Sequence, residues 1–292
     1  MNAKLLISNV SRLQRSLAVN EVVVAPNEPM NLASIWTSSA EKFPDRTAIK
    51  MDDVELSYTD LDQLSQKLAG LLAAKGVGCG DRIALICPNL PYMPVVFYGA
   101  LRAGAIVVPM NPLLKSREVA FHLENSGASI AFAWEGVVEE VQAGAARAAD
   151  ESGHTPVEVV PLDGNFMTLL DATEALPAMA DTTAGDTAVV LYTSGTTGNP
   201  KGAELTHDNL LSNCDVSVGM FKINENDVIF GGLPLFHIFG LTCGLNAAIR
   251  TGSSLTLLPR FDPAKALEII ERDKVTIFMG VNRPGVSGDF LV

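Results

Sequence analysis

The feature of this sequence that most constrains its fold is a regular alternation of short apolar runs with segments of helical spacing. The apolar runs lie at 82–87, 105–109, 128–133 and 157–161, and the helical segments between them at 91–102, 116–125 and 137–150. Strands that are apolar along their whole length and are separated by helices predict a parallel sheet covered on both faces. The chain is therefore expected to form a mostly parallel, doubly wound α/β fold.

The alternation extends in both directions from this region. Thr59 is expected to cap a helix that Gly76 ends, because leucines recur at helical spacing between them. The stretch Asn165–Thr187 has weak periodicity and many small residues, so we expect it to cross the surface between two sub-lobes. Thr206 is expected to cap a later helix. Further strands are expected at 188–192, 202–205, 228–231, 254–258 and 275–281, and further helices at 241–250 and 263–273.

The composition argues against several classes of function. The chain has 292 residues, 48% of them hydrophobic, and a formal net charge of −12, whereas nucleic-acid binders carry a basic surface. Its four cysteines show neither C-x-x-C spacing nor a nearby histidine pair, so we expect no disulfide framework, no metal site and a cytoplasmic location. No apolar run approaches the roughly 20 residues that span a bilayer. Residues 1–29 are expected to be an extension of a domain that begins at Met30.

The stretch that most suggests chemistry is LYTSGTTGNPKG at positions 191–202. Its glycines let the backbone approach an oxyanion, its hydroxyl groups can donate hydrogen bonds, and its lysine adds a positive charge. A single GTTG turn is typical of an ordinary hairpin, but this density of donors directly after an apolar strand favours a phosphate-binding loop. The residues expected to bind phosphate are Thr193, Ser194, Gly195, Thr196, Thr197, Gly198 and Lys201.

The loop is not of the Walker type. Pro200 stands where that motif has its second glycine, and a glycine follows Lys201 where a hydroxyl residue would bind magnesium. Because proline resists a helix interior, Lys201 is expected to leave the turn on a second strand. The loop is thus expected to join two strands.

The histidines do not form an obvious catalytic group. A lone histidine flanked by Phe236 and Ile238, as His237 is, is more often a buried core side chain than a catalytic one. His207 is expected at the surface of a helix start, and His122 in a helix with charged neighbours. We assign no chemistry to either, and the acidic residues show no pairing at a spacing suited to acid–base catalysis.

Four segments, taken in order, resemble the AMP-forming adenylating superfamily, which includes acyl-CoA synthetases, aryl-CoA ligases and luciferases. TSGTTGNPKG resembles the signature phosphate loop of that family, and the resemblance runs from about Leu32 to Val281. The other three segments are LSYTDL at 56–61, LRAGAIVVP at 101–109 and PLFHIFG at 234–240.

The resemblance implies a two-step ligase that uses ATP, Mg²⁺ and coenzyme A. The phosphate loop would hold the β- and γ-phosphates of ATP. His237 would donate a hydrogen bond to the substrate carboxylate at the mouth of an acyl pocket, and Phe239 and Gly240 would line or open the acyl channel. The implied substrate is a fatty or aryl acid, with a weak preference for a fatty acid.

The chain also departs from the family pattern. It lacks the later "Y-G-x-T-E" and "T-G-D" stretches that bind adenine, ribose and magnesium in the family, and residues 282–292 match nothing in it. Residues 30–281 are therefore expected to be a partial adenylation domain, inactive alone. The alternative is a catalytically inactive remnant that binds a phosphate ligand or a partner. A peripheral membrane contact and a homo-oligomer both remain open.

Overall fold

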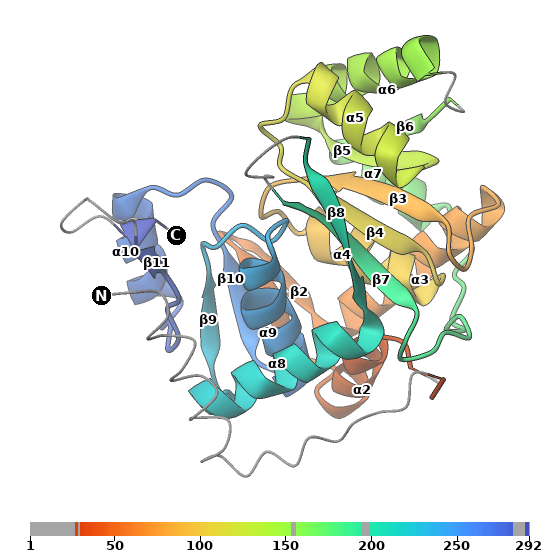
Figure 1. The fold of residues 1–292 in the computed structure, drawn as a ribbon. Coiled ribbons are helices and arrows are strands. Elements are labelled where there is room, and N and C mark those ends of the chain that lie inside the picture. Colours follow the sequence, from red (N-terminus) through yellow and green to blue (C-terminus); the bar gives the residue numbers. More distant parts are fainter. Residues whose placement is uncertain (1–26, 29, 153–155, 194–198, 283–289, 292) are drawn as a thin grey trace, which may run out of the picture.

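The described residues form two large sheets that lie side by side, with helices packed around them (Figure 1), and a separate pair of short strands. The computed structural model describes residues 27–28, 30–152, 156–193, 199–282 and 290–291. None of the helices in these ranges is long and apolar enough to cross a membrane.

The larger sheet has six strands in the order β6-β5-β3-β4-β7-β8. All neighbouring strands are parallel except the pair β7–β8, in which β8 forms an antiparallel edge. The strands are β3 (Arg82–Ile86), β4 (Ile106–Met110), β5 (Ile130–Trp134), β6 (Glu158–Leu162), β7 (Thr187–Thr193) and β8 (Lys201–Thr206). The predicted doubly wound sheet is confirmed.

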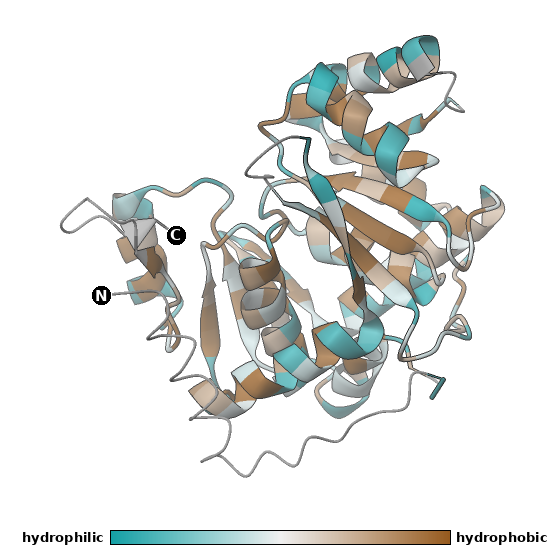
Figure 2. Cartoon of the chain, in the orientation of Figure 1, coloured by the Kyte–Doolittle hydropathy of each residue, from teal (hydrophilic) through white to brown (hydrophobic). Residues whose placement is uncertain are grey.

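Helices cover both faces of this sheet, as its apolar strands require. The helices α3 (Tyr58–Ala74) and α4 (Tyr92–Arg102) share a core with Ile83 and Leu85 of β3. On the opposite face, α5 (Ser116–Ser126) and α6 (Val138–Ser152) share a core with Ala84 and Ile86. Successive side chains of a strand point to opposite faces, so β3 contributes to both cores. In Figure 2 its neighbouring strands are hydrophobic, and hydrophilic residues lie on α5 and α6.

The smaller sheet combines strands from the two ends of the described chain, in the order β2-β1-β10-β9. Its strands are β1 (Thr47–Met51), β2 (Val54–Ser57), β9 (Val228–Gly231) and β10 (Ser254–Leu257), and only β2 runs antiparallel to its neighbour. Ile49, Ile229 and Leu255 belong to the same core as α3 and α4, so the two sheets share one interior. Phe230 packs on the other side with α10 (Pro263–Arg272).

Further elements connect or flank the sheets. The helix α8 (His207–Phe221) runs beneath both of them in Figure 1, and a π-helix (Gly240–Asn246) leads into α9 (Ala247–Thr251). The remaining elements are α2 (Ser34–Lys42), a 3₁₀ turn (Glu135–Val137), α7 (Gly164–Asp171) and the strand pair β11 (Val281–Asn282) and β12 (Phe290–Leu291).

Two expectations are wrong: the position of the split between the two sub-lobes and the length of the strand at 275–281. The sub-lobes do not separate at Asn165–Thr187, because β7 and β8 join the larger sheet and the smaller sheet draws strands from both ends. Part of that stretch is the helix α7, which buries Phe166 and Leu170. The expected strand at 275–281 is reduced to a bridge between Ile229 and Ile277 and to the two residues of β11.

The expected cap of α3 is also wrong by two positions, whereas that of α8 is right. Ser57 caps α3, since its side chain accepts a hydrogen bond from the backbone N–H of Asp60. The Thr59 hydroxyl instead donates to the carbonyl of Pro44 at 3.0 Å. Thr206 caps α8 by accepting from the N–H of Asn209, as predicted.

Two glycines with left-handed backbones form a matched pair for a stability test. Gly252 has φ of +77°, and a Cβ there would lie 2.2 Å from Cδ2 of Phe43. Gly76 has φ of +76° and no atom within 4 Å of such a Cβ. Gly76→Ala is expected to lower the free energy of unfolding by about 1 kcal/mol for backbone strain, and Gly252→Ala by at least about 1 kcal/mol more for the clash. Equal losses in denaturant titrations would contradict this reading.

Candidate active site

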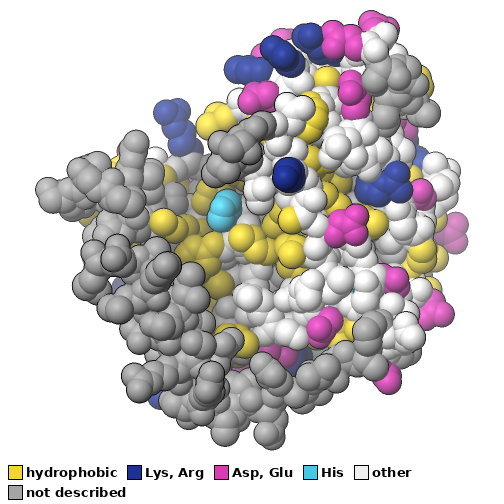
Figure 3. All heavy atoms as spheres, viewed as in Figure 1, with side chains coloured by type: hydrophobic (Ala, Val, Ile, Leu, Met, Phe, Trp, Pro, Cys, Tyr) yellow, Lys and Arg dark blue, Asp and Glu magenta, His cyan; other side chains and the backbone are white. Residues whose placement is uncertain are grey.

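A cavity of about 750 Å³ opens where the parallel strands of the larger sheet end. Its walls come from the end of β4 with the turn after it, from the end of β7, from one face of α5 and from the loop after β9. Ligands in open α/β sheets bind outside the carboxyl ends of the strands, which is where this cavity lies. On the face shown in Figure 3, hydrophobic side chains are exposed around a histidine.

The ends of the predicted phosphate loop lie at this cavity. Thr193 is the last residue of β7 and pairs with Lys201, the first residue of β8, so the expectation that the loop joins two strands is confirmed. Thr193, Asn199 and Pro200 line the cavity. Ser194, Gly195, Thr196, Thr197 and Gly198 lie outside the described residues, and their role stays a prediction.

Lys201 is exposed and directly follows Pro200, which lines the cavity. No ion pair joins its ammonium group to an acidic side chain in the described part of the chain. A lysine without an ion pair can form one with an anionic ligand.

His237 lies on the opposite wall, in the loop between β9 and the π-helix. The loop turns there because the N–H of His237 donates to the carbonyl of Pro234 at 3.1 Å. The ring is exposed, and its Nδ1 accepts a hydrogen bond from the N–H of Phe239 at 3.3 Å. In that arrangement the neutral ring carries its proton on Nε2, so Nε2 is the atom that can donate to a ligand.

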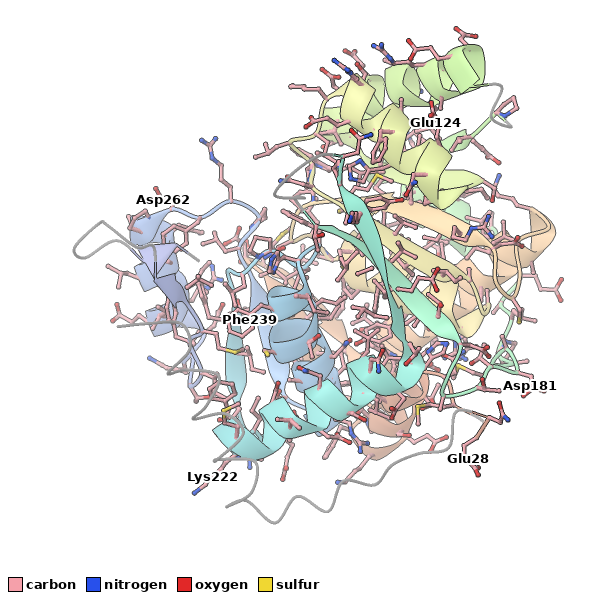
Figure 4. All side chains as sticks on the ribbon, in the orientation of Figure 1. Glu28, Glu124, Asp181, Lys222, Phe239 and Asp262 are labelled. Atoms are coloured by element: carbon pink, nitrogen blue, oxygen red, sulfur yellow. The ribbon has the colours of Figure 1, made fainter. Side chains whose placement is uncertain are left out.

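Phe239 and Gly240 are not among the residues that line this cavity. Phe239, labelled in Figure 4, packs partly buried against the core shared by the two sheets. Gly240 begins the π-helix, and a Cβ at this position would lie only 2.3 Å from the carbonyl oxygen of Pro234. Glycine is therefore required there by close backbone packing, and the role of both residues in an acyl channel remains a prediction.

The wall of the cavity that α5 forms was not predicted from the sequence. Arg117, Glu118, Phe121 and His122 of α5 line the cavity together with Tyr192 of β7. The ring centroids of His122 and Tyr192 are 4.3 Å apart, and Tyr192 donates a hydrogen bond to Asn125 at 2.7 Å. Burial raises the pKa of Tyr192, so its hydroxyl stays protonated at neutral pH. The available signal was the i, i+4 spacing of Arg117 and Phe121, which a solvated helix face also explains.

His207 is not the surface residue that the sequence led us to expect. Its side chain is 2% exposed, and its Nδ1 accepts a hydrogen bond from the N–H of Leu32 at 3.0 Å. Burial lowers the pKa of His207 to about 4, against an opposing effect of Asp186. The residue is thus a neutral core histidine that ties the N-terminal part of the fold to the start of α8.

This burial predicts a pH-dependent stability. A histidine whose pKa is about 4 when folded and about 6.5 when unfolded binds more protons in the unfolded chain between these values. The contribution of neutral His207 to the free energy of unfolding is complete above pH 6.5 and falls as the pH drops toward 4. The expected loss between pH 7.5 and 4.5 is roughly 2–3 kcal/mol. Urea titrations should show a smaller loss for His207→Asn, which keeps an acceptor and does not titrate; an equal loss in both proteins would exclude this cause.

Within the described residues, no group of three or more histidine, cysteine, aspartate and glutamate side chains could hold a metal ion. Arg117 and Glu118 are charged residues that line the cavity, and Lys201 follows the lining residue Pro200 in the sequence. The predicted phosphate site would use lysine, hydroxyl and backbone donors.

These features define the class of the protein: a doubly wound α/β domain with a cavity at the carboxyl ends of its strands. Residues 36–284 match the model of the family described as AMP-binding enzyme. The chain belongs to this family, and the resemblance drawn from its four motifs is confirmed.

Individual relatives include ligases of both fatty and aryl acids. The chain is 33% identical over 284 residues to a long-chain-fatty-acid–CoA ligase of Bacillus subtilis (strain 168), covering 87% of this chain and 50% of that protein. It is 35% identical to 4-coumarate–CoA ligase 5 of Oryza sativa subsp. japonica, covering 76% and 41%. A fatty acyl CoA synthetase structure from Mycobacterium tuberculosis superposes with a TM-score of 0.78 at 27% identity, covering 85% and 48%. The chain thus spans about half the length of the curated relatives it matches.

Proposed function

We propose that this chain carries the phosphate-binding and acid-binding half of an AMP-forming acyl-CoA ligase. In the first step a carboxylate oxygen attacks the α-phosphorus of ATP and pyrophosphate leaves, which gives an acyl adenylate. In the second step the thiol of coenzyme A attacks the acyl carbon, AMP leaves and the thiol proton passes to solvent. The carboxylate oxygen is a poor leaving group at neutral pH, whereas AMP is a good one.

The observation that carries the proposal is the convergence of two sequence motifs on one cavity. Thr193 at the end of β7 lines one wall together with Asn199 and Pro200, and it pairs with Lys201 at the start of β8. The loop after β9 brings His237 to the same cavity. These are the motifs whose family counterparts hold phosphate and carboxylate. Their meeting in three dimensions supports a shared role that motif order alone could not.

Each group has a defined task in the proposal. Lys201 and the hydroxyl and backbone donors of residues 193–198 would stabilise the negative charge that accumulates on the departing pyrophosphate. The Nε2–H of His237 would hold the substrate carboxylate without acting as an essential base. Phe239 and Gly240 are proposed to shape the acyl channel beyond it.

The substrate is proposed to be a fatty acid, with an aryl acid as the second choice. The cavity wall includes the apolar side chains of Met110, Leu114, Phe121, Leu191 and Phe236. An apolar wall favours a hydrocarbon substituent over a charged one. The Bacillus subtilis relative is named for long-chain fatty acids, and the rice relative for 4-coumarate.

ATP and coenzyme A are co-substrates in this proposal, and Mg²⁺ accompanies the ATP phosphates. No described residue is assigned to Mg²⁺. A cytoplasmic location is proposed from the cysteine pattern, and no described feature is assigned to a membrane contact or to a homo-oligomer.

The role of His237 can be tested by binding. His237→Ala is expected to weaken binding of decanoate to the chain about ten-fold, because it removes a hydrogen bond to a charged group. Methyl decanoate is the matched control ligand, since it keeps the hydrocarbon and lacks the carboxylate charge. Calorimetric titration should show unchanged binding of the ester. An equal effect on both ligands would assign His237 to the apolar wall instead.

The alternative is a remnant without catalysis that binds a phosphate ligand or a partner. The two proposals differ in what the DNA downstream of codon 292 encodes. The ligase predicts the Y-G-x-T-E and T-G-D stretches in one of its reading frames. Their absence from the locus would favour the remnant.

A further inference from the structure

The candidate site is built from two sheets, so its geometry depends on how the carboxyl ends of these sheets are held together. Thr193 and Lys201 belong to the larger sheet, and His237 follows β9 of the smaller one. A ligand that touches both walls needs a fixed spacing between them, because a shift of about 1 Å can cost about 100-fold in rate.

One buried side chain makes this connection. Asn89 lies between β3 and α4 and is 3% exposed. Its Nδ2 donates to the carbonyl of Gly231 at 2.9 Å and to that of Leu233 at 2.8 Å. Its Oδ1 accepts from the N–H of Leu235 at 2.9 Å. Both amide N–H groups and the carbonyl oxygen are therefore used. Their partners are the last residue of β9, Gly231, and two residues of the loop after it, Leu233 and Leu235.

Further hydrogen bonds connect the residues that bind Asn89 with the turn that carries His237. Pro234, between two of the bonded residues, accepts the hydrogen bond from the N–H of His237. The carbonyl of His237 in turn accepts from the N–H of Leu241 at 2.9 Å, inside the π-helix. Gly240 packs directly against the backbone of Leu233 and Pro234. Displacement of residues 231–235 would therefore move the His237 turn and the helix start together.

We propose that Asn89 is a positioning residue that fixes the His237 loop against the sheet that carries the phosphate-binding strands. This inference rests on the proposed function for its purpose, since it gives the spacing between the carboxylate site and the phosphate site. Asn89 itself touches neither the cavity nor the reacting groups. It acts through the backbone of Gly231, Leu233 and Leu235.

A second buried asparagine offers a matched control. Asn31 is 6% exposed, donates to the carbonyl of Leu101 at 2.7 Å and accepts from the N–H of Ala33 at 2.9 Å. It resembles Asn89 in burial and in its long-range bond, but its partners lie on α4 and before α2. Asn31→Ser should therefore lower stability without moving the His237 loop.

The test compares Asn89→Ser and Asn89→Asp with Asn31→Ser in the 292-residue chain. Serine cannot reach all three partners, and aspartate keeps the acceptor but sets an oxygen against two carbonyl oxygens. Hydrogen exchange of peptides covering 232–241 is expected to accelerate about ten-fold or more in both Asn89 variants. The imidazole NMR signal of His237, assigned by its absence in His237→Gln, is expected to shift or split. Asn31→Ser should show neither change while its thermal midpoint falls.

Two results would overturn the proposal. One is an unchanged His237 signal in a folded Asn89 variant; the other is an equal change in Asn31→Ser. If the Asn89 variants do not fold, hydrogen exchange in the wild-type chain tests the proposal instead. The Leu235 amide is expected to exchange as slowly as core amides, and fast exchange would refute the hydrogen bond to Asn89. None of these measurements needs ATP or turnover, so a failure of the proposed ligase function would be seen separately.

Discussion

Replacing Lys201 with alanine is expected to weaken ATP binding by the 292-residue chain about 10- to 100-fold. The lysine is exposed and makes no ion pair with the described residues, so its removal takes away little packing. A charge-assisted hydrogen bond to phosphate is worth about 1.5–3 kcal/mol, which corresponds to this range of affinities. Equilibrium dialysis with labelled ATP measures the effect, and in a complete ligase the same change should lower turnover.

The matched control for Lys201 is Lys75, another exposed lysine, which lies after α3 and pairs with Glu158. Lys75→Ala should leave ATP binding unchanged, and both variants should keep the thermal midpoint of the wild-type chain. If Lys201→Ala binds ATP as tightly as wild type, Lys201 has no part in phosphate binding. If it unfolds, the lysine has a structural role that the described contacts do not account for.

Residues 1–292 alone are expected not to complete thioester formation. The motifs that fix adenine, ribose and magnesium in the family do not occur in this sequence. Alignment of reacting groups is worth about 7–11 kcal/mol of a barrier, and phosphoryl-type chemistry depends largely on such positioning. Without those groups the α-phosphate is not held in line with the attacking carboxylate. Acid-dependent pyrophosphate–ATP exchange and acyl-CoA formation should both stay at the level of the protein-free control.

The exchange assay should use a fatty acid and an aryl acid in parallel, with an intact ligase as the positive control. Robust acid-dependent exchange by the 292-residue chain would show that its own residues align the α-phosphate. That outcome would also eliminate the remnant alternative, since a remnant performs no adenylation.

Much of the larger sheet could be predicted because its signals are local. Each βα unit from β3 to β6 shows its own change from apolar run to helical spacing, and the Thr206 cap is read from adjacent residues. The pairing of β1 with β10 could not be predicted, since Ile49 and Leu255 meet across about 200 residues of sequence. That pairing, which no local pattern encodes, assembles the smaller sheet from strands that lie far apart in the sequence.

Part of the candidate site could also be predicted from the sequence. The loop stood out by its density of glycines, hydroxyl residues and a lysine, and His237 stood out through the resemblance to the adenylating superfamily. In the structure Thr193 and His237 line one cavity, and Lys201 pairs with Thr193. His207 was misjudged because its burial comes from the backbone of Leu32, far away in the chain. The α5 wall and Asn89 were missed because charged helix faces and single asparagines are common in any sequence. Their importance depends on what packs against them.

The central claim is that this chain binds ATP through its phosphates, and competition binding tests this claim most directly. Labelled ATP bound to the 292-residue chain is challenged with tripolyphosphate or with adenosine. The account predicts that tripolyphosphate displaces ATP and adenosine does not, because the proposed contacts of Thr193 and Lys201 are with phosphate. Displacement by adenosine but not by tripolyphosphate would contradict it.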